Sequence, residues 1–162
     1  MFARRTDARY DCLVQGGPPR PERPEPSRSV AIASSVDAAT GIVTLTFTGV
    51  SSYDHWERAV ATVLADPAYH VGMCFVSDRR MATDIMTKDY IGRVVDYLSR
   101  SGGKFLGCGW ALVADDPADF GMTRMGAIFA ERTPVEVRAF QSMDGALEWL
   151  RVRMSPPPHG PA

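Results

Sequence analysis

Apolar and polar positions alternate with a period of two in an early stretch of the chain. Over residues 42–48, a valine, a leucine and a phenylalanine fall on one face, and three threonines fall on the other. This alternation, with its β-branched residues, is typical of a half-buried strand. A second strand is predicted over residues 30–36. The short turn over residues 37–41 predicts that the two strands form an antiparallel hairpin.

Four later segments have the spacing of amphipathic helices. The first is capped by Ser51 or Ser52, and Glu57 lies too far along for a capping box. The second begins at Thr87 and the third at Asp116 before a proline, an arrangement that favours a helix start. The fourth covers residues 143–152. The side chains predicted to face inward are Trp56, Ala59, Val60, Val63 and Leu64, then Tyr90, Ile91, Val94, Val95 and Leu98, then Met122, Met125, Ile128 and Phe129, and finally Ala146, Leu147, Trp149 and Leu150.

Three further strands are predicted between these helices. An apolar run over residues 71–76 indicates a buried strand, and a polar loop is expected over residues 79–86. Residues 105–114 form a nearly continuous apolar run, which is typical of a central strand buried on both faces. Residues 135–140 alternate charged and apolar side chains, as an edge strand does.

The predicted order of elements is therefore β-β-α-β-α-β-α-β-α. It corresponds to an α/β domain with a mixed, mostly parallel five-stranded sheet flanked by helices. A single domain is expected over residues 29–154. Residues 1–28 and 155–162 are rich in proline and are predicted to be disordered tails. A polyproline II ligand and a misassigned start are the alternatives for residues 1–28.

Composition and charge exclude several classes of function. The formal net charge of −1 predicts no binding to nucleic acid. The three cysteines, Cys12, Cys74 and Cys108, are not spaced as metal ligands, so neither a disulfide scaffold nor a zinc site is expected. A reducing, cytoplasmic setting fits them best. The chain lacks an apolar run of the roughly 18 residues that an integral membrane segment needs.

Charged residues gather after two of the predicted parallel strands. Asp78 and Arg79 follow the first of these strands, and Asp115 follows the next. Paired carboxylates at such an edge serve as metal ligands or in acid–base catalysis. The default interpretation is that Asp78 pairs with Arg79 or Arg124. An enzyme that uses Asp78 and Asp115 is kept as a remote alternative, and no catalytic residue, metal ligand or cofactor is assigned.

Thr87 and several methionines also qualify as site residues. A phosphate on Thr87 would meet the free N–H groups of a helix start, although a simple N-cap explains the threonine equally well. Met86 in the loop and Met122 and Met125 on the third helix fall near the same sheet edge. Methionine lines adaptable apolar pockets, and it also fills cores.

The chain resembles the STAS domain, and more specifically the SpoIIAA-like (STAS/Sec14-like) bacterial proteins. The resemblance covers about residues 30–150. Its motifs are Leu45-Thr46-Phe47-Thr48-Gly49, Val76-Ser77-Asp78-Arg79-Arg80, Phe120-Gly121-Met122-Thr123-Arg124-Met125, Val137-Arg138-Ala139-Phe140 and Ala146-Leu147-Glu148-Trp149-Leu150. STAS antagonists are phosphorylated on a serine in an Asp-Ser-Ser/Thr-Gly turn. Residues 83–88 lack that turn, so Thr87 is only its nearest positional stand-in.

Together these observations predict a non-enzymatic binding or regulatory module of STAS type that makes protein–protein contacts at the carboxyl edge of the sheet. The alternative, implied by the Sec14 side of the resemblance, is a carrier or sensor of a small apolar or anionic, lipid-like ligand at the same edge. A homodimer is left open. The residues predicted to bind the ligand or partner are Asp78, Arg79, Met86, Thr87, Asp115, Met122, Arg124 and Met125.

Overall fold

A computed structural model describes residues 31–155 of the chain. The strands are β1 (Ile32–Asp37), β2 (Ile42–Gly49), β3 (Cys74–Ala82), β4 (Gly109–Val113) and β5 (Glu136–Phe140). The helices are α1 (Tyr53–Ala65), α2 (Lys88–Arg100), the short 3₁₀ helix η1 (Gly102–Phe105), α3 (Pro117–Ala130) and α4 (Met143–Met154). The tail predictions fall outside the described residues, except at Ser155, which caps α4.

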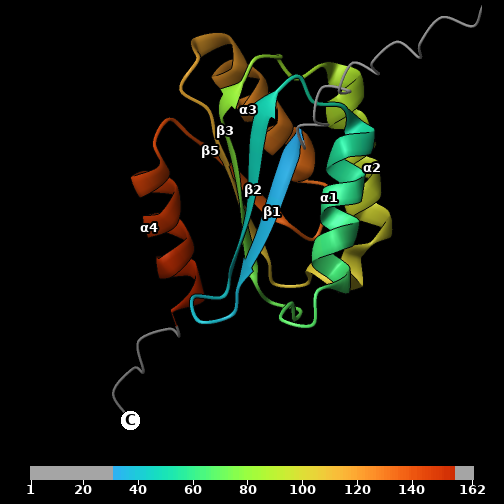
Figure 1. The fold of residues 1–162 in the computed structure, drawn as a ribbon, viewed down its shortest axis with the longest axis vertical. Helices are drawn as coiled ribbons and strands as arrows, with labels where there is room; N and C mark the ends of the chain where they lie inside the picture. The colour runs from blue at the N-terminus through green and yellow to red at the C-terminus, as the bar shows by residue number, and fades with distance from the viewer. Residues whose placement is uncertain (1–30, 156–162) are drawn as a thin grey trace, which may run out of the picture.

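The strands form one five-stranded sheet in the order β1-β2-β3-β4-β5. β1 and β2 are antiparallel, and the remaining neighbours are parallel, which confirms the predicted mixed sheet. α1 and α2 lie on one side of the sheet and α4 lies on the other (Figure 1). α3 packs against α2 and β5. The carboxyl ends of β2, β3, β4 and β5 therefore meet at one edge, at the top of Figure 1.

Each face of the sheet has its own apolar core. The larger core joins β1, β2, β3 and β4 to α1 and α2, and includes stacked rings of Trp56, Phe75 and Trp110. The smaller core lies under α4 and includes Val113 and Leu150. None of the helices described is long and apolar enough to cross a bilayer.

β3 is longer at its carboxyl end than the sequence pattern predicts. It runs through residues 79–82, which the polarity of the sequence assigned to a loop. Thr48 pairs with Met81 and Gly49 with Ala82, after an irregularity in β2 between Thr46 and Thr48. The loop prediction was wrong here because the side chain of Arg79 is buried by specific polar partners, which an apolar-polar pattern does not reveal.

The predicted central strand is shorter than its apolar run. Residues 102–105 form η1, and β4 begins only at Gly109. Leu106 in the connection is exposed, although Phe105 and Cys108 on either side are buried. The run therefore contributes side chains to the core from a turn as well as from a strand.

α3 buries a different face from the one predicted. Its buried residues are Asp119, Thr123, Gly126 and Ala130, while Ile128 is 58% exposed and Phe129 is also exposed. Met122 and Met125 are only half-buried. A Cβ on Gly126 would already lie within ordinary contact distance of Ile91 and Leu112. The buried face of α3 is thus made of small residues because α2 and the sheet approach it closely.

The helix starts agree with the predicted capping residues. Ser52 caps α1, and the capping box is completed by His55, which accepts from the Ser52 N–H, and not by Glu57. Thr87 caps α2, and Asp116 caps α3 with a proline at the first helical position. These caps fix where each helix leaves the carboxyl edge of the sheet.

Candidate functional site at the carboxyl edge of the sheet

The four α-helices within residues 31–155 all begin at the carboxyl edge of the sheet, and each carries an aspartate in its first turn. These residues are Asp54, Asp89, Asp119 and Asp144. Basic residues lie in the last turns of α2 and α4, toward the opposite edge. Negative charge is favourable at a helix N-terminus, because the peptide dipoles point their positive end there. The consequence for the molecule is that one edge of the sheet is rich in carboxylates.

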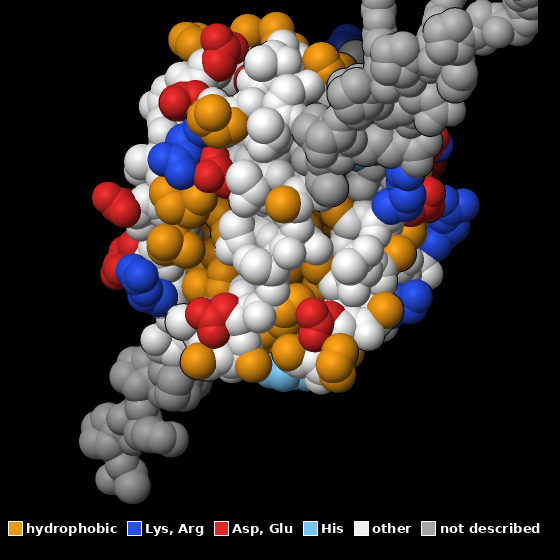
Figure 2. All heavy atoms as spheres, in the orientation of Figure 1, with side chains coloured by type: hydrophobic (Ala, Val, Ile, Leu, Met, Phe, Trp, Pro, Cys, Tyr) orange, Lys and Arg blue, Asp and Glu red, His pale blue; other side chains and the backbone are white. Residues whose placement is uncertain are grey.

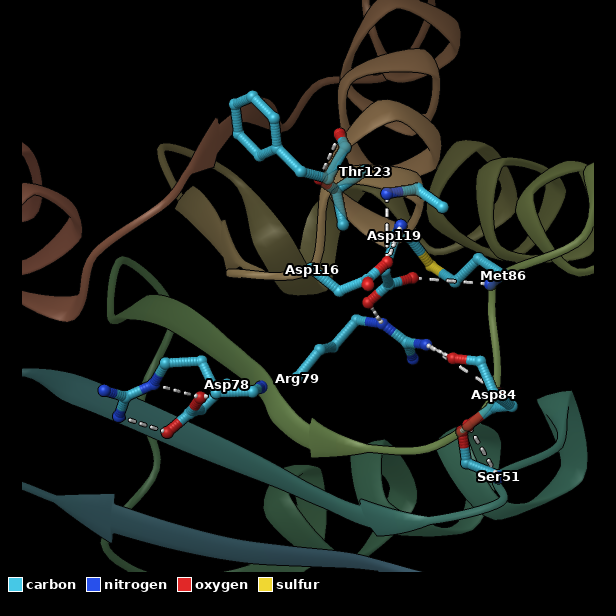
Figure 3. Close-up of polar contacts among 11 residues, drawn as sticks. Ser51, Asp78, Arg79, Asp84, Met86, Asp116, Asp119 and Thr123 are labelled. Carbon is cyan, nitrogen blue, oxygen red and sulfur yellow. Dashed lines mark hydrogen bonds and ion pairs between the residues drawn. The ribbon is translucent and has the colours of Figure 1, made fainter.

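Arg79 is the buried cation of this edge. Its side chain is only 1% exposed, and its Nε donates to Oδ2 of Asp119 over 2.8 Å. Nη2 donates to the backbone carbonyl of Asp84 over 3.0 Å, and the guanidinium lies 5.0 Å from the centre of the Phe47 ring. Nη1 is also buried, but it has no hydrogen-bond acceptor among residues 31–155. Figure 3 shows the contacts of Arg79 with Asp119 and Asp84.

The partners of Arg79 tie four segments together. Oδ1 of Asp119, on α3, accepts from the backbone N–H of Met86 in the loop before α2. The Asp84 carboxylate in the same loop accepts from the backbone N–H and the hydroxyl of Ser51, just before α1. β3, α3, the loop over residues 83–87 and the start of α1 are therefore held in one polar network (Figure 3).

A polar cleft of about 300 Å³ opens at this edge. It is lined by Arg79, Arg80, Ala82, Thr83, Asp84, Ile85, Asp115, Asp116 and Asp119. Four carboxylates thus face two guanidinium groups. Beside the cleft, Met81 is 66% exposed and Ile85 is 52% exposed. In the view of Figure 2, acidic and hydrophobic side chains lie next to one another along the upper end of the molecule.

A second, apolar cavity of about 50 Å³ lies between the sheet and helices α2 and α3. Its walls include Trp56, Met86, Tyr90, Trp110 and Gly126. Arg79 lines this cavity as well as the polar cleft, so its guanidinium stands between the two. Burial raises the pKa of the Tyr90 phenol, which keeps this hydroxyl neutral.

Asp78 pairs with a different arginine from either of those predicted. It accepts from Nε and Nη2 of Arg80 over 2.9 and 2.8 Å, and not from Arg79 or Arg124. The hydrogen bond from Arg80 lowers the pKa of the Asp78 carboxyl. Asp78 does not line the cleft that contains Asp115, and Arg124 is exposed on α3.

The other predicted residues divide between the two cavities and the surface. Met86 is buried and lines the apolar cavity, whereas Met122 and Met125 line neither cavity. The exposed Thr87 accepts from the backbone N–H of Tyr90 as the cap of α2. Its phosphorylation stays a prediction.

Sequence reasoning missed Asp119 and Asp84. Asp119 looked like an ordinary first-turn aspartate, and Asp84 looked like a loop residue. A signal was available for Asp119, because Thr123, Gly126 and Ala130 follow it at helical spacing with only small side chains. A stripe of small residues on a helix indicates a closely packed face, so an aspartate on that stripe needs a buried partner.

Comparisons with known proteins bear on the fold of the chain. No family model matches the chain, and neither does a curated protein. Among solved structures, the chain is similar to an uncharacterized protein of the DUF3478 family from Shewanella loihica PV-4, whose fold is described as SpoIIAA-like. The two share 18% identity with a TM-score of 0.52, over 74% of this chain and 94% of that one.

This chain has a SpoIIAA-like fold. The similarity confirms the predicted α/β architecture and the fold that the sequence motifs implied. Within this SpoIIAA-like fold, the carboxyl edge carries the buried arginine, the acidic cleft and the apolar cavity.

Proposed function

We propose that this SpoIIAA-like domain is a binding module whose carboxyl edge recognises a basic, partly apolar segment of a protein partner. The observation that supports the proposal is the exposure of Met81 and Ile85, at 66% and 52%, beside a cleft with more carboxylates than guanidinium groups. Apolar side chains rimmed by charge are typical of protein interaction sites.

The charges of the cleft favour a basic partner. Arg79 is occupied by Asp119, and Arg80 is occupied by Asp78. The exposed Asp115 has no hydrogen bond or ion pair within residues 31–155. An arginine of a partner is suited to such a carboxylate because its guanidinium donates two parallel hydrogen bonds. Asp115 is therefore the residue that would confer charge specificity.

Site-specific photo-crosslinking in cells of the source tests this proposal. A photoreactive phenylalanine analogue at Ile85 is compared with the same analogue at Leu106, which is somewhat more exposed and belongs to the η1–β4 connection. We expect a discrete adduct only from position 85. Adding Asp115→Arg should abolish the adduct, whereas adding Asp96→Arg on α2 should leave it unchanged. An adduct yield that is unchanged by Asp115→Arg, or an equal yield from position 106, would contradict the proposal.

A second candidate function is supported by the buried Nη1 of Arg79. Because an unpaired buried donor is costly, a ligand oxygen that accepted from Nη1 would gain a strong hydrogen bond. The adjoining cavity of about 50 Å³ is apolar, so the candidate ligand is small, with an apolar body and a carbonyl or anionic head. The cavity is smaller than the roughly 150 Å³ that accommodates a benzene ring in an engineered core.

Tryptophan fluorescence tests the second candidate, because Trp56 and Trp110 both line the cavity. Titration with short carboxylic acids should change the emission saturably in the native protein. Gly126→Leu, which places a side chain in the cavity, should suppress the response, and the surface change Gly121→Ala should not. A response that survives Gly126→Leu, or no saturable response to any chain length, would exclude the cavity as a ligand site.

A further inference from the structure

We propose that the acidic cleft is occupied in the free protein by this chain's own N-terminal segment, residues 1–30, which thereby competes with the partner. The inference rests on the proposed function, since it assigns an occupant to the same surface. It is an intramolecular regulation of that surface, and it follows from where the segment joins the sheet and from its charge.

The N-terminal segment joins the fold at the carboxyl edge. β1 is antiparallel to β2, so the first residue of β1, Ile32, pairs with Phe47 near the carboxyl end of β2. The carbonyl of Ala31 accepts from the N–H of Thr48 over 2.9 Å, and Thr48 pairs in turn with Met81 of β3. Ala31, the first residue described, is therefore two strands away from the exposed Met81, and the segment before it needs no long path to the cleft.

The composition of residues 1–30 complements the cleft. The segment contains six arginines against four acidic residues, whereas the rest of the chain contains twelve basic and fifteen acidic residues. Arginines 4, 5 and 9 lie close to Phe2, Tyr10, Leu13 and Val14, so basic and large apolar side chains occur together. This is the chemistry that Asp115, Met81 and Ile85 favour at the edge.

The length of the segment permits this docking. Twenty-two residues separate Arg9 from Ile32 in the sequence. A linker of that length is long enough to reach from Ala31 to the cleft at the same edge of the sheet. A tether of this length holds the segment at an effective concentration on the order of millimolar, so weak contacts suffice for occupancy.

The volume of the cleft limits how many side chains of the N-terminal segment can enter it. About 300 Å³ accommodates one or two arginine side chains, and not a folded element. We therefore expect that one or two of Arg4, Arg5 and Arg9 enter the cleft against Asp115, and that the apolar residues of the segment cover Met81 and Ile85.

A nitroxide on Cys12 tests this inference in the full chain. Cys74 and Cys108 are 1% and 0% exposed, so a thiol-reactive label applied under native conditions is directed to the third cysteine. Paramagnetic broadening of backbone amide signals then reports where the segment lies. We expect strong broadening at Ile85 and Asp115, and little at Val71 and Leu106. At about 0.5 M salt the broadening should fall by roughly half or more, because the Debye length shrinks to about 4 Å.

Charge variants separate docking from mere tethering. Asp115→Asn should reduce the broadening at Ile85, and so should Arg4→Gln, Arg5→Gln and Arg9→Gln together. Asp96→Asn, which neutralises an exposed aspartate on α2, should leave it unchanged. The inference would be overturned if the broadening only declined with distance from Ile32 and were the same in the native chain and in Asp115→Asn. In a control, isotope-enriched chains without the nitroxide are mixed with chains that carry the nitroxide. Equal broadening in this mixture would mean that the segment docks on a second copy of the chain, and this result would also overturn the inference.

The outcome for the proposed function is read separately. If the nitroxide on Cys12 does not broaden the signals of Ile85 and Asp115 but the adduct at position 85 still depends on Asp115, the edge binds a partner. In that case only the assignment of residues 1–30 as the occupant of the cleft is wrong. If both fail, the proposed surface is wrong. If the inference holds, the triple arginine-to-glutamine variant should increase the yield of that adduct, because the competing segment has lost its charge.

Discussion

Nε of Arg79 lies 2.8 Å from Oδ2 of Asp119, and both side chains are almost completely buried. The pair links the fifth residue after the start of β3 to the first turn of α3. Removing one partner from a buried ion pair leaves an uncompensated charge in a poorly solvated place. The pair therefore makes α3 and the end of β3 depend on each other.

Asp119→Ala should destabilise the protein by about 3–5 kcal/mol, because it leaves the guanidinium of Arg79 buried without its carboxylate. Urea denaturation followed by tryptophan fluorescence measures the change. Asp115→Ala is the matched control, since Asp115 is exposed, and its effect should stay within about 0.5 kcal/mol. Equal losses of unfolding free energy in the two variants would show that the Arg79–Asp119 pair does not stabilise the fold.

Thr87→Ala should destabilise α2 by about 1 kcal/mol, since the threonine hydroxyl accepts from the Tyr90 N–H as the helix cap. Thr87→Ser keeps the acceptor and should retain most of the stability. Hydrogen exchange of the first turn of α2 reports the difference. If alanine and serine behave alike, the cap contributes little at this position.

Asp78 gives the stability of the protein a defined dependence on acid pH. The hydrogen bond from Arg80 lowers its pKa in the folded state below the ordinary value of 3.8. Its stabilising contribution is therefore present above the unfolded pKa and is lost as the pH falls through the folded pKa. Asp78→Asn should flatten the fall in stability below about pH 4. If the melting temperature of Asp78→Asn fell with acid pH as steeply as that of the native protein, this assignment would be contradicted.

Gly126→Ala should be tolerated or stabilising, by up to about 1 kcal/mol, because alanine favours a helix and its Cβ meets Ile91 and Leu112 only at 3.9 Å. Gly109→Ala provides the contrast, since its Cβ would lie 2.5 Å from Cδ of Arg153. We expect that change to destabilise the protein. The midpoint of urea unfolding compares the two, and the reverse order would mean that the packing around Gly126 is misassigned.

Cys108 should be unreactive in the native protein. Burial raises the pKa of its thiol to about 12, so very little thiolate is present at neutral pH. Its modification by Ellman's reagent should require opening of the fold, so at constant pH the rate should rise with urea in parallel with the population of opened molecules. A rate that stays constant while urea increases that population would show that the thiol is accessible in the native protein.

The sequence predicted the fold because the fold depends on repeated local patterns. The threonine-rich alternation of β2 and the caps at Thr87 and Asp116 are signals that neighbouring residues carry themselves. The order of strands follows from short right-handed connections between them. These rules need no knowledge of which side chains touch at long range.

The centre of the candidate site escaped prediction because it depends on contacts between distant residues. Arg79 and Asp119 are separated by 40 positions, and each looks like a surface residue in its own segment. The same cause misplaced the buried face of α3, where the pattern favoured Ile128 over Thr123. Buried polar pairs reverse the rule that charge lies outside, and a single sequence does not show which charges are paired.

The most direct test of the central claim is a titration of the isotope-labelled full chain with a short peptide of alternating arginine and leucine, followed by amide chemical shifts. The triple substitution of Arg4, Arg5 and Arg9 by glutamine is used, so that the chain's own segment does not compete. A twin peptide with glutamine for arginine is the control. The account predicts saturable shifts at Ile85 and Asp115, absent at Val71 and Leu106 and absent with the glutamine peptide. Shifts at the opposite edge, or equal shifts with both peptides, would contradict it.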